Sequence, residues 1–321
     1  SVGELYPQSQ AIEGDYTHQE MGEGSQYEGV IPSTFDTSSI SAVASWEMDF
    51  WGKYRRAIRA NDAGFLASIA AYDDALVSLT AEIGSSYISI RSYQAQIIVT
   101  KRNILAQKIS LKIVQSQYDA GQADLISVQE AIASLKQTQA SLPGIKISLE
   151  QEKDALAVLL GTTPNKVYAL VKTEKAIIPV APSSIAVGIP KEVLEQRPDV
   201  KEAQLEAIEQ SEAIGATKAQ LYPALSLVGS FGYSTSDVNG SSNSDLFKWS
   251  NHTVSIGPSL YLPLFNYGQI TNQVREQDAA FQQAIFNYQN VVLTAQQEVQ
   301  DGIVSYAESK KSLKDMEEAN N

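Results

Sequence analysis

The sequence predicts an α+β chain with internal structural duplication, in which long antiparallel α-helical hairpins are combined with four β-strands. Leu5-Tyr6-Pro7 recurs as Leu221-Tyr222-Pro223, and Glu82 recurs as Glu298, at one offset of 216 (222 − 6 and 298 − 82). Strand-like alternation occurs at matching places in both copies, and a long helical pattern follows each. A constant offset means that both copies carry the same elements at the same lengths.

Four segments have the period-2 alternation of strands. In the first copy, residues 12–16 belong to one strand and residues 40–50 to the next. In the second copy, strands are expected at 225–233 and 253–265, joined by a polar surface loop at 237–252 that is rich in Ser, Asn and Gly. Each copy therefore predicts one strand hairpin.

The remaining pattern is helical. Residues 53–118 contain no proline and predict one helix of about 65 residues, or roughly 100 Å. Gly121 suits the left-handed residue that ends a helix, and a return helix follows at 124–160 until Gly161 and Pro164 stop it. The predicted segments are a first strand hairpin (1–52), a first long helical hairpin (53–160, tip 119–123), an irregular segment (161–197), a return helix (198–221), a second strand hairpin (222–265) and a second long helix (266–321) that stops before its tip.

Composition excludes several classes of function. A net charge of -13 argues against nucleic acid as a partner, because phosphate contacts need clustered Lys and Arg. Without cysteine there is no disulfide and no thiolate metal site. No run of eighteen apolar residues occurs, so a membrane role would depend on β-strands. Catalytic motifs are lacking and the two histidines are far apart, so we expect no enzyme activity, cofactor or metal site.

Four strands are too few to close a barrel, which needs about eight. An open sheet in lipid would also leave its edges unpaired. We therefore expect an oligomer in which several chains share one tube. Two chains would supply eight strands and three would supply twelve, and only the larger barrel has room for a lumen, so a transport role favours three chains.

The motifs that carry this plan resemble the outer membrane factors, the TolC-like exit ducts of bacterial tripartite efflux pumps, and among them the NodT and OprM lipoprotein branch. They follow one another in the order of that family and span nearly the whole chain. They are Ser45-Trp46-Glu47-Met48-Asp49-Phe50-Trp51-Gly52-Lys53, Leu156-Ala157-Val158-Leu159-Leu160-Gly161-Thr162-Thr163-Pro164, Gln196-Arg197-Pro198-Asp199-Val200, Ile214-Gly215-Ala216 through Leu221-Tyr222-Pro223, and Leu262-Pro263-Leu264-Phe265-Asn266-Tyr267-Gly268.

The resemblance implies a homotrimer in the bacterial outer membrane, with a twelve-stranded β-barrel continuous with an α-helical periplasmic tunnel. It also implies an equatorial domain, here residues 161–197. Partners would be outer-membrane lipid, a periplasmic adaptor (membrane fusion) protein and an inner-membrane transporter of the RND type. Substrates expelled by that transporter would pass through the duct passively.

Measured against the family, the chain is expected to be truncated at both ends. Asn321 matches Leu105 (321 − 216), so the second outbound helix stops before a counterpart of Gly121. The partner of the 198–221 helix would precede Ser1. A lipidated cysteine of the NodT type would lie in that preceding segment.

An acidic stripe lies on the predicted 198–221 helix. Four carboxylates recur at steps of three, four and three residues, which places them on one helical face. Charge runs usually face solvent, so an outer surface is the plain interpretation, and the alternative is a lumen lining that favours cations. Ion selectivity in single-channel recordings distinguishes the two. The residues are Asp199, Glu202, Glu206 and Glu209.

The tip of the first helical hairpin is the second candidate site. By the resemblance, the matching tip docks the hairpin of the periplasmic adaptor, and the docking residues would be Tyr118, Gly121, Leu125 and Val128. Ser127 stands where the family often has Asp. A purely structural interpretation is also open, with Gly121 as a helix cap and the apolar residues as coiled-coil core.

Aromatic and cationic residues cluster where the strands meet the helices. Such residues suit a membrane interface, with rings at headgroup depth and cations near lipid phosphates, although core packing is an equal alternative. Trp51 or Tyr54 is the best candidate for the aromatic girdle. The membrane-interface candidates are Trp46, Trp51, Tyr54, Arg55, Arg56 and Tyr267.

The leading functional hypothesis is a passive export duct for drugs or other small toxic molecules. A related hypothesis is a TolC-like duct for type I polypeptide secretion. A non-conducting coiled-coil scaffold of the cell envelope is the hypothesis from a different class. Conductance in planar bilayers separates the ducts from the scaffold.

Overall fold

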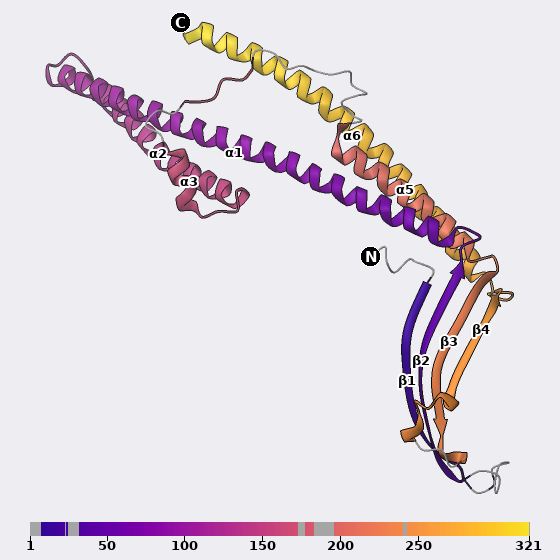
Figure 1. Cartoon of the computed structure of the whole chain (residues 1–321). Helices are drawn as coiled ribbons and strands as arrows, with labels where there is room; N and C mark the ends of the chain where they lie inside the picture. The colour runs from indigo at the N-terminus through magenta and orange to yellow at the C-terminus, as the bar shows by residue number, and fades with distance from the viewer. Residues whose placement is uncertain are drawn as a thin grey trace. The chain divides into compact units, whose positions relative to one another are not determined.

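The structure is a computed structural model that describes residues 8–22, 24, 32–172, 177–182, 196–239 and 243–320. The chain divides into two compact units, one formed by Ser1–Ala71 with Pro190–Asn321 and the other by Tyr72–Ile189. Helix α1 (Lys53–Asp119) belongs to both (Figure 1). The predicted repeat motif Leu5-Tyr6-Pro7 and residues 173–176 and 183–195 of the predicted irregular segment lie outside the described residues.

The first unit contains one antiparallel sheet with the strand order β1-β2-β3-β4. Its strands are β1 (Gln8–Glu20), β2 (Thr34–Met48), β3 (Ala224–Ser236) and β4 (His252–Tyr261), which confirms the four predicted strands. Both hairpins join into a single sheet because β2 pairs with β3, with Ala42 opposite Phe231. The connection from β3 to β4 contains three short turns of 3-10 helix, at 237–239, 243–245 and 249–251.

Two predicted strand ends are wrong. The second hairpin was expected to reach Phe265, but β4 ends at Tyr261. Pro263 has no N–H to donate to a ladder, and its ring restricts the backbone of Leu262, so pairing stops before it. In the first copy β2 likewise ends at Met48, short of Phe50.

The duplication predicted from the sequence is present in the backbone. Strand β3 begins 216 residues after β1 (224 − 8), and α6 (Gln269–Asn320) begins 216 residues after α1 (269 − 53). A glycine with a left-handed backbone conformation directly precedes α1 and α6, with φ of 79° at Gly52 and 81° at Gly268. Only glycine adopts this conformation without strain, so both strand-to-helix turns need the same residue at the same place.

Small residues allow the helices of the first unit to pack closely. Helix α5 (Pro198–Ala219) packs on α6 in Figure 1, and its Ala203 and Ala207 are buried. The start of α1 also lies against α5, because a Cβ added to Gly215 would come within 2.5 Å of Arg56 Cδ. Gly215 therefore leaves the space that the Arg56 side chain occupies.

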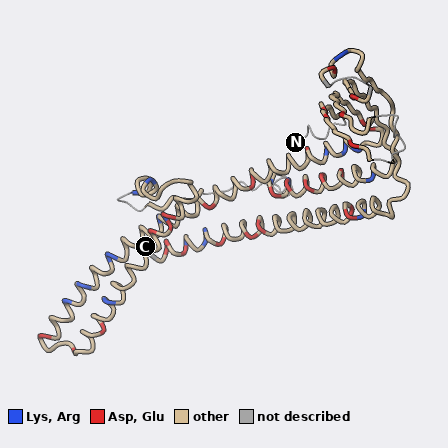
Figure 2. Tube along the Cα trace, turned by 90° about the horizontal axis from the view of Figure 1, so that it is seen from below, with Lys and Arg blue, Asp and Glu red and all other residues tan. Residues whose placement is uncertain are grey.

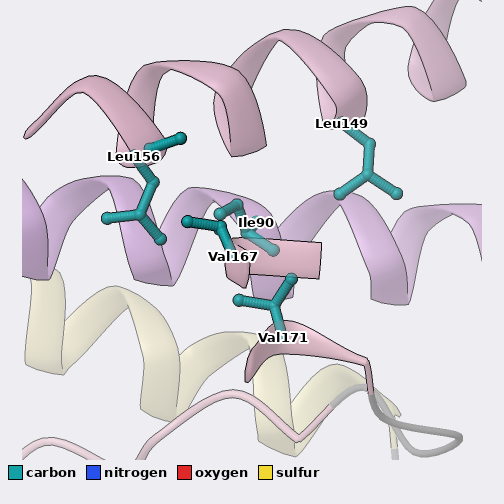
Figure 3. Packing of buried hydrophobic residues seen from close by; sticks show 6 residues of the cluster. Ile90, Leu149, Leu156, Val167 and Val171 are labelled. Atoms are coloured by element: carbon teal, nitrogen blue, oxygen red, sulfur yellow. The ribbon is translucent and has the colours of Figure 1, made fainter. Parts of the chain in front are cut away.

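The core of the second unit is a cluster of aliphatic side chains from three helices (Figure 3). Ile90 comes from α1, Leu149 and Leu156 from α2 (Leu125–Leu159), and Val167 and Val171 from α3 (Pro164–Val171). Ile90 and Val167 are fully buried. The cluster holds the C-terminal end of α2 against α1.

Helix α3 corrects a sequence prediction. Residues from 161 onward were expected to be irregular because Gly161 and Pro164 were taken to stop the preceding helix. Pro164 instead occupies the first turn of α3, where a missing N–H costs nothing. Buried Arg91 then stabilises the end of α3 by donating from Nη1 to the Val171 carbonyl at 3.3 Å.

Within the described part of the chain, no helix combines the length and the apolar character needed to cross a membrane.

Candidate functional site

The sheet of the first unit has one apolar face that is exposed to its surroundings. The registers place Ile12, Ala42, Phe231 and Val254 side by side in one row across all four strands. Alternate residues of each strand point the same way, so neighbouring rows at every second position share this face. The apolar face is defined here as Ile12, Ile40, Ala42, Trp46, Leu225, Leu227, Phe231, Tyr233, Val254, Ile256 and Leu260.

These side chains are open to the surroundings within the chain. Ile12 is 79% exposed, Ile256 75% and Leu260 68%. A soluble sheet buries its apolar face against another layer, whereas this sheet presents it outward. The face therefore needs an apolar environment that the described part of the chain does not supply.

The opposite face of the sheet is dominated by small polar residues. One row contains Glu13, Ser41, Gly232 and Thr253, and the next contains Ala11, Val43, Ser230 and Ser255. Serine and threonine hydroxyls suit water, and their small size leaves room in front of the sheet. The polar face is defined here as Glu13, Ser41, Ser45, Ser226, Ser230, Gly232, Thr253, Ser255 and Ser259.

The sheet has two free edges within the described residues, because β1 pairs only with β2 and β4 only with β3 in its strand order. An edge strand presents a row of N–H and C=O groups that can pair with a strand of another chain. The two-faced sheet is thus incomplete in a single chain, both at its edges and on its apolar face.

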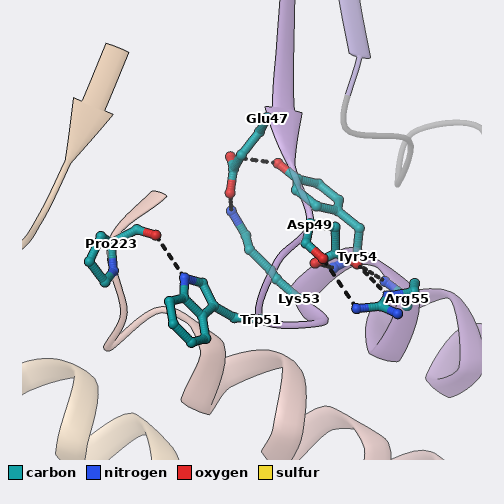
Figure 4. Close-up of polar contacts among 7 residues, drawn as sticks. All are labelled: Glu47, Asp49, Trp51, Lys53, Tyr54, Arg55 and Pro223. Atoms are coloured by element: carbon teal, nitrogen blue, oxygen red, sulfur yellow. Dashed lines mark hydrogen bonds and ion pairs between the residues drawn. The ribbon is translucent and has the colours of Figure 1, made fainter. Parts of the chain in front are cut away.

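A polar network holds the β2–α1 connection in place (Figure 4). Glu47 accepts hydrogen bonds from Lys53 Nζ at 3.1 Å and from Tyr54 Oη at 2.8 Å. Asp49 accepts from the Arg55 backbone N–H at 3.0 Å and from Arg55 Nε at 3.2 Å. Partial burial works to raise the pKa of Asp49, but the backbone N–H groups of Arg55 and Tyr54 and the Arg55 side chain outweigh it and lower the pKa. Asp49 is therefore an ionised cap for the start of α1.

Trp51 joins the β2–α1 connection to the α5–β3 connection. Its ring stacks on Tyr222 with 4.6 Å between centroids. Its Nε1–H donates to the Pro223 carbonyl at 2.9 Å (Figure 4). A hollow of about 250 Å³ adjoins this pair, and Glu47, Asp49, Lys53 and Tyr261 are among its lining residues. The partner Tyr222 was missed from the sequence as a site residue, although it belongs to the repeated Leu-Tyr-Pro motif.

The predicted membrane-interface residues do not form one cluster. Trp46 lies on the apolar face and is 43% exposed. Trp51, Tyr54 and Arg55 meet at the β2–α1 connection, whereas Arg56 points to Glu212 of α5, 3.8 Å away. Tyr267, with a φ of 50°, is fully exposed at the β4–α6 connection. Their role at a membrane interface stays a prediction.

The acidic stripe of α5 is half-buried rather than fully solvent-facing. Arg197 holds Asp199 through Nε at 3.0 Å and Nη2 at 2.8 Å, and also contacts Glu298 of α6 at 2.6 Å. The Arg197 hydrogen bonds lower the pKa of Asp199, against partial desolvation. Glu209 lies so close to α1 that a Cβ on Gly64 would be 2.8 Å from its Oε2. Acidic and basic residues are interspersed along the helices in Figure 2.

The hairpin tip in the second unit forms as predicted around Gly121, whose φ is 74°. Its N–H donates to Tyr118 O at 2.9 Å, and Asp124 caps α2 by accepting from Ser127 N at 2.8 Å. This bond lowers the pKa of Asp124. The turn is therefore a stable left-handed helix end followed by a capped helix start.

The exposed surface of the tip differs from the predicted set. Tyr118 is 39% exposed and Leu125 54%, but Val128 is 3% exposed and packs inside the unit. Ile126, which the sequence prediction left out, is 67% exposed. With Leu125 it lines a shallow hollow of about 410 Å³ that also includes Gln129, Glu130 and Ala133. The spacing of apolar residues along a coiled-coil helix does not by itself distinguish buried Val128 from exposed Leu125 at the end of a hairpin.

No group of three or more His, Cys, Asp or Glu residues in the described ranges is arranged to hold a metal ion. A histidine–carboxylate contact joins His18 Nδ1 and Asp36 Oδ1 at 2.6 Å, near the end of β1. It closes a cross-strand pair between β1 and β2.

Comparison with known proteins places this architecture in a family. Residues 11–162 and 189–320 match the family model described as Outer membrane efflux protein. Nodulation protein T of Rhizobium leguminosarum bv. viciae is 29% identical over 289 residues, which are 90% of this chain and 58% of that protein. The solvent efflux pump outer membrane protein SrpC of Pseudomonas putida is 25% identical over 266 residues, 83% of this chain and 55% of that protein.

The solved structures agree in fold. The crystal structure of the outer membrane protein VceC from Vibrio cholerae superposes with a TM-score of 0.87 at 24% identity, covering 99% of this chain and 74% of that chain. The chain spans 58% and 55% of the lengths of the two relatives named above. Because the family model covers most of the 321 residues and the fold agrees, this chain belongs to the outer membrane efflux protein family.

Proposed function

We propose that the complete protein is the outer-membrane exit duct of a tripartite efflux pump, which passively conducts drugs or other small toxic molecules from the periplasm to the exterior. The observation that carries the proposal is the two-faced sheet with free edges. Lipid would cover the apolar face, water would fill the space before the polar face, and neighbouring chains would pair with β1 and β4.

The oligomer is a homotrimer in this proposal. Four strands from each of three chains give a barrel of twelve, whereas two chains would give a barrel of eight that its own side chains fill. The small side chains of the polar face, such as Ser230 and Ser255, support an open lumen. Conduction along such a lumen needs no catalytic group, so the duct acts without enzyme activity.

The relatives support efflux over polypeptide secretion. SrpC is, by its name, the outer membrane protein of a solvent efflux pump. By analogy, the partners of this protein are a periplasmic adaptor and an inner-membrane transporter of the RND type. In a deletion strain, drug or solvent sensitivity is the result expected, and loss of a secreted polypeptide instead would favour the type I secretion duct.

The decisive test of the duct is conductance of the full-length protein in planar bilayers. A matched pair of variants sharpens it, because Ile256 and Ser255 are neighbours on opposite faces of β4. Ile256→Asp places a charge in lipid and is expected to abolish pores, while Ser255→Asp faces water and is expected to keep them. A full-length protein that inserts but never conducts would support the envelope scaffold.

The exposed tip residues Leu125 and Ile126 are proposed to dock the adaptor, together with Tyr118 and the turn at Gly121. Ile126→Asp is expected to weaken efflux while trimers still assemble. Ile147→Asp is the control, because Ile147 is 59% exposed on the same helix but four turns or more from the tip. Equal loss of efflux in both variants would contradict docking at the tip.

The acidic stripe is proposed to contribute to the lumen, and Glu206 is the member chosen to test this, since Asp199 is bound by Arg197 and Glu209 lies against α1. Glu206→Gln is expected to lower the preference for cations in single-channel recordings. Anion preference that is unchanged by the substitution would remove the lumen interpretation.

A further inference from the structure

The connection between β3 and β4 carries two large aromatic side chains that its polar composition hides. Phe247 and Trp249 are each 68% exposed. The sequence pattern predicted only a polar surface loop at 237–252, because Ser, Asn and Gly predominate there. Exposed aromatic residues on a fixed loop are unusual for a surface that meets only water.

The loop holds these residues in a defined position. Lys248 Nζ contacts Asp245 Oδ2 at 2.8 Å, and Asn251 Nδ2 donates to the Asp245 carbonyl at 2.8 Å. Backbone bonds from Lys248 N to Asp245 O and from Asn251 N to Lys248 O close two successive turns at 2.9 Å each. Phe247 and Trp249 are therefore presented by ordered turns.

The aromatic rings continue the apolar face of the sheet. Phe247 contacts Tyr233 edge-on, with 5.7 Å between centroids, and Tyr233 contacts Phe231 in the same way at 5.8 Å. Trp249 stacks on His252, the residue opposite Tyr233 in the register, at 4.5 Å. Phe247 and Trp249 thus extend the apolar face beyond Tyr233, at the loop end of β3, on the same side of the sheet as Phe231 and Val254.

The height of the apolar face fits one bilayer. From Leu225 to Tyr233 the strand advances eight residues, or about 27 Å at roughly 3.4 Å per residue. With the usual barrel tilt of about 40° this gives about 20 Å along the membrane normal, close to the apolar band of about 25 Å that aromatic girdles flank in such proteins. Trp46 lies near the helix-side end of the band, and the loop aromatics lie at the other end.

We infer that Phe247 and Trp249 form the outer half of an aromatic girdle and bind the headgroup region of the outer-leaflet lipid. Aromatic rings prefer this depth because they have an apolar body and a polar or polarisable rim. Continuity with the apolar face favours lipid over a protein partner as the occupant. The inference rests on the proposed function, since it requires that the apolar face meets lipid.

The cysteine-free chain permits a direct test by single-site nitroxide labelling of the full-length protein in vesicles of outer-membrane lipid. Trp249→Cys and, separately, Phe247→Cys report the loop, Val254→Cys the middle of the apolar face, and Ser230→Cys the polar face. Relative collision with oxygen and with a water-soluble nickel chelate gives the depth of each label. Two loop variants are used so that a folding defect in one leaves the other informative.

The expected result is a deep lipid position at 254, an interfacial position at 247 and 249, and an aqueous position at 230. A lipid position at 254 with fully aqueous labels at 247 and 249 would overturn the inference and leave the proposed duct intact. An aqueous label at 254 would overturn both. Loop labels shielded from oxygen and from the chelate alike would show that protein, such as a second copy, covers the loop in place of lipid.

Discussion

At the residue scale, Trp51 connects two chain segments that are 172 residues apart by one ring contact and one hydrogen bond. Trp51→Ala is expected to lower the free energy of unfolding by about 2 kcal/mol, because the aromatic pair and the hydrogen bond each contribute about 1 kcal/mol. Trp51→Phe keeps the stack with Tyr222 and should lose about half of that. Thermal unfolding of the full-length protein in detergent measures both. Equal effects of the two substitutions would show that the hydrogen bond alone matters.

Alanine substitution at two glycines that both lie within helices is expected to change the stability of the protein in opposite directions. Gly215→Ala places a methyl group against the Arg56 side chain and should destabilise the protein by about 1 kcal/mol or more. Gly144 in α2 has nothing within 4 Å of its missing Cβ, so Gly144→Ala should stabilise the protein by about 1 kcal/mol through its higher helix propensity. The comparison uses the same thermal measurement. Stabilisation by Gly215→Ala would show that Arg56 moves aside without cost.

At the element scale, the contact between the start of α5 and α6 depends on pH. Arg197 makes this contact, because it binds both Asp199 and Glu298 of α6. The pKa of Asp199 is lowered in the folded protein by the Arg197 hydrogen bonds. A lowered folded-state pKa contributes stability that is present above the unfolded pKa of about 3.9 and is lost as the pH falls through the folded value. Asp199→Asn should therefore reduce the melting temperature at neutral pH and flatten its decline in acid.

The control for this titration is Asp315→Asn, since Asp315 is an exposed carboxylate near the end of α6. This substitution should leave the decline of the melting temperature in acid as it is in the parent protein. Melting temperatures across a pH series from neutral to about pH 3 supply the measurement. An acid limb as steep in Asp199→Asn as in the parent would assign the pH dependence to other groups.

The elements were predictable where a pattern depends on local chemistry. Period-2 alternation and the absence of proline located the strands and α1, and the repeat predicted a second long helix at 266–321, which the structure begins at Gln269 as α6. Proline has two meanings, and Pro164 was taken as a stop although it begins α3. Exposure depends on contacts between distant segments, so neither the burial of Val128 nor the aromatic surface at Phe247 and Trp249 followed from spacing. The half-buried acidic stripe was missed for the same reason.

At the scale of the whole molecule, the two edges that the described sheet leaves unpaired allow a test of how chains would assemble in the proposed oligomer. Within one chain β1 and β4 are separated by three strand spacings, or about 14 Å, which is beyond the reach of a disulfide. An intermolecular pairing of β4 with β1 would bring their Cα atoms to about 5 Å. Any disulfide between the two edges must therefore join two chains.

We expect the full-length variant Ala11→Cys with Ser255→Cys, and its neighbours with cysteine at Thr253 or Ser259, to yield covalent trimers on oxidation in the membrane. All four positions face the polar side. Three positions on β4 are used because the register between β4 and the β1 of a neighbouring chain sets which of them lies next to residue 11. Ala11→Cys with Ser230→Cys is the control, because β3 is an inner strand and should not cross-link. Denaturing gels without reductant measure the products. A ladder that ends at dimers would contradict three-fold closure, because a closed ring of three chains has three equivalent β4–β1 seams.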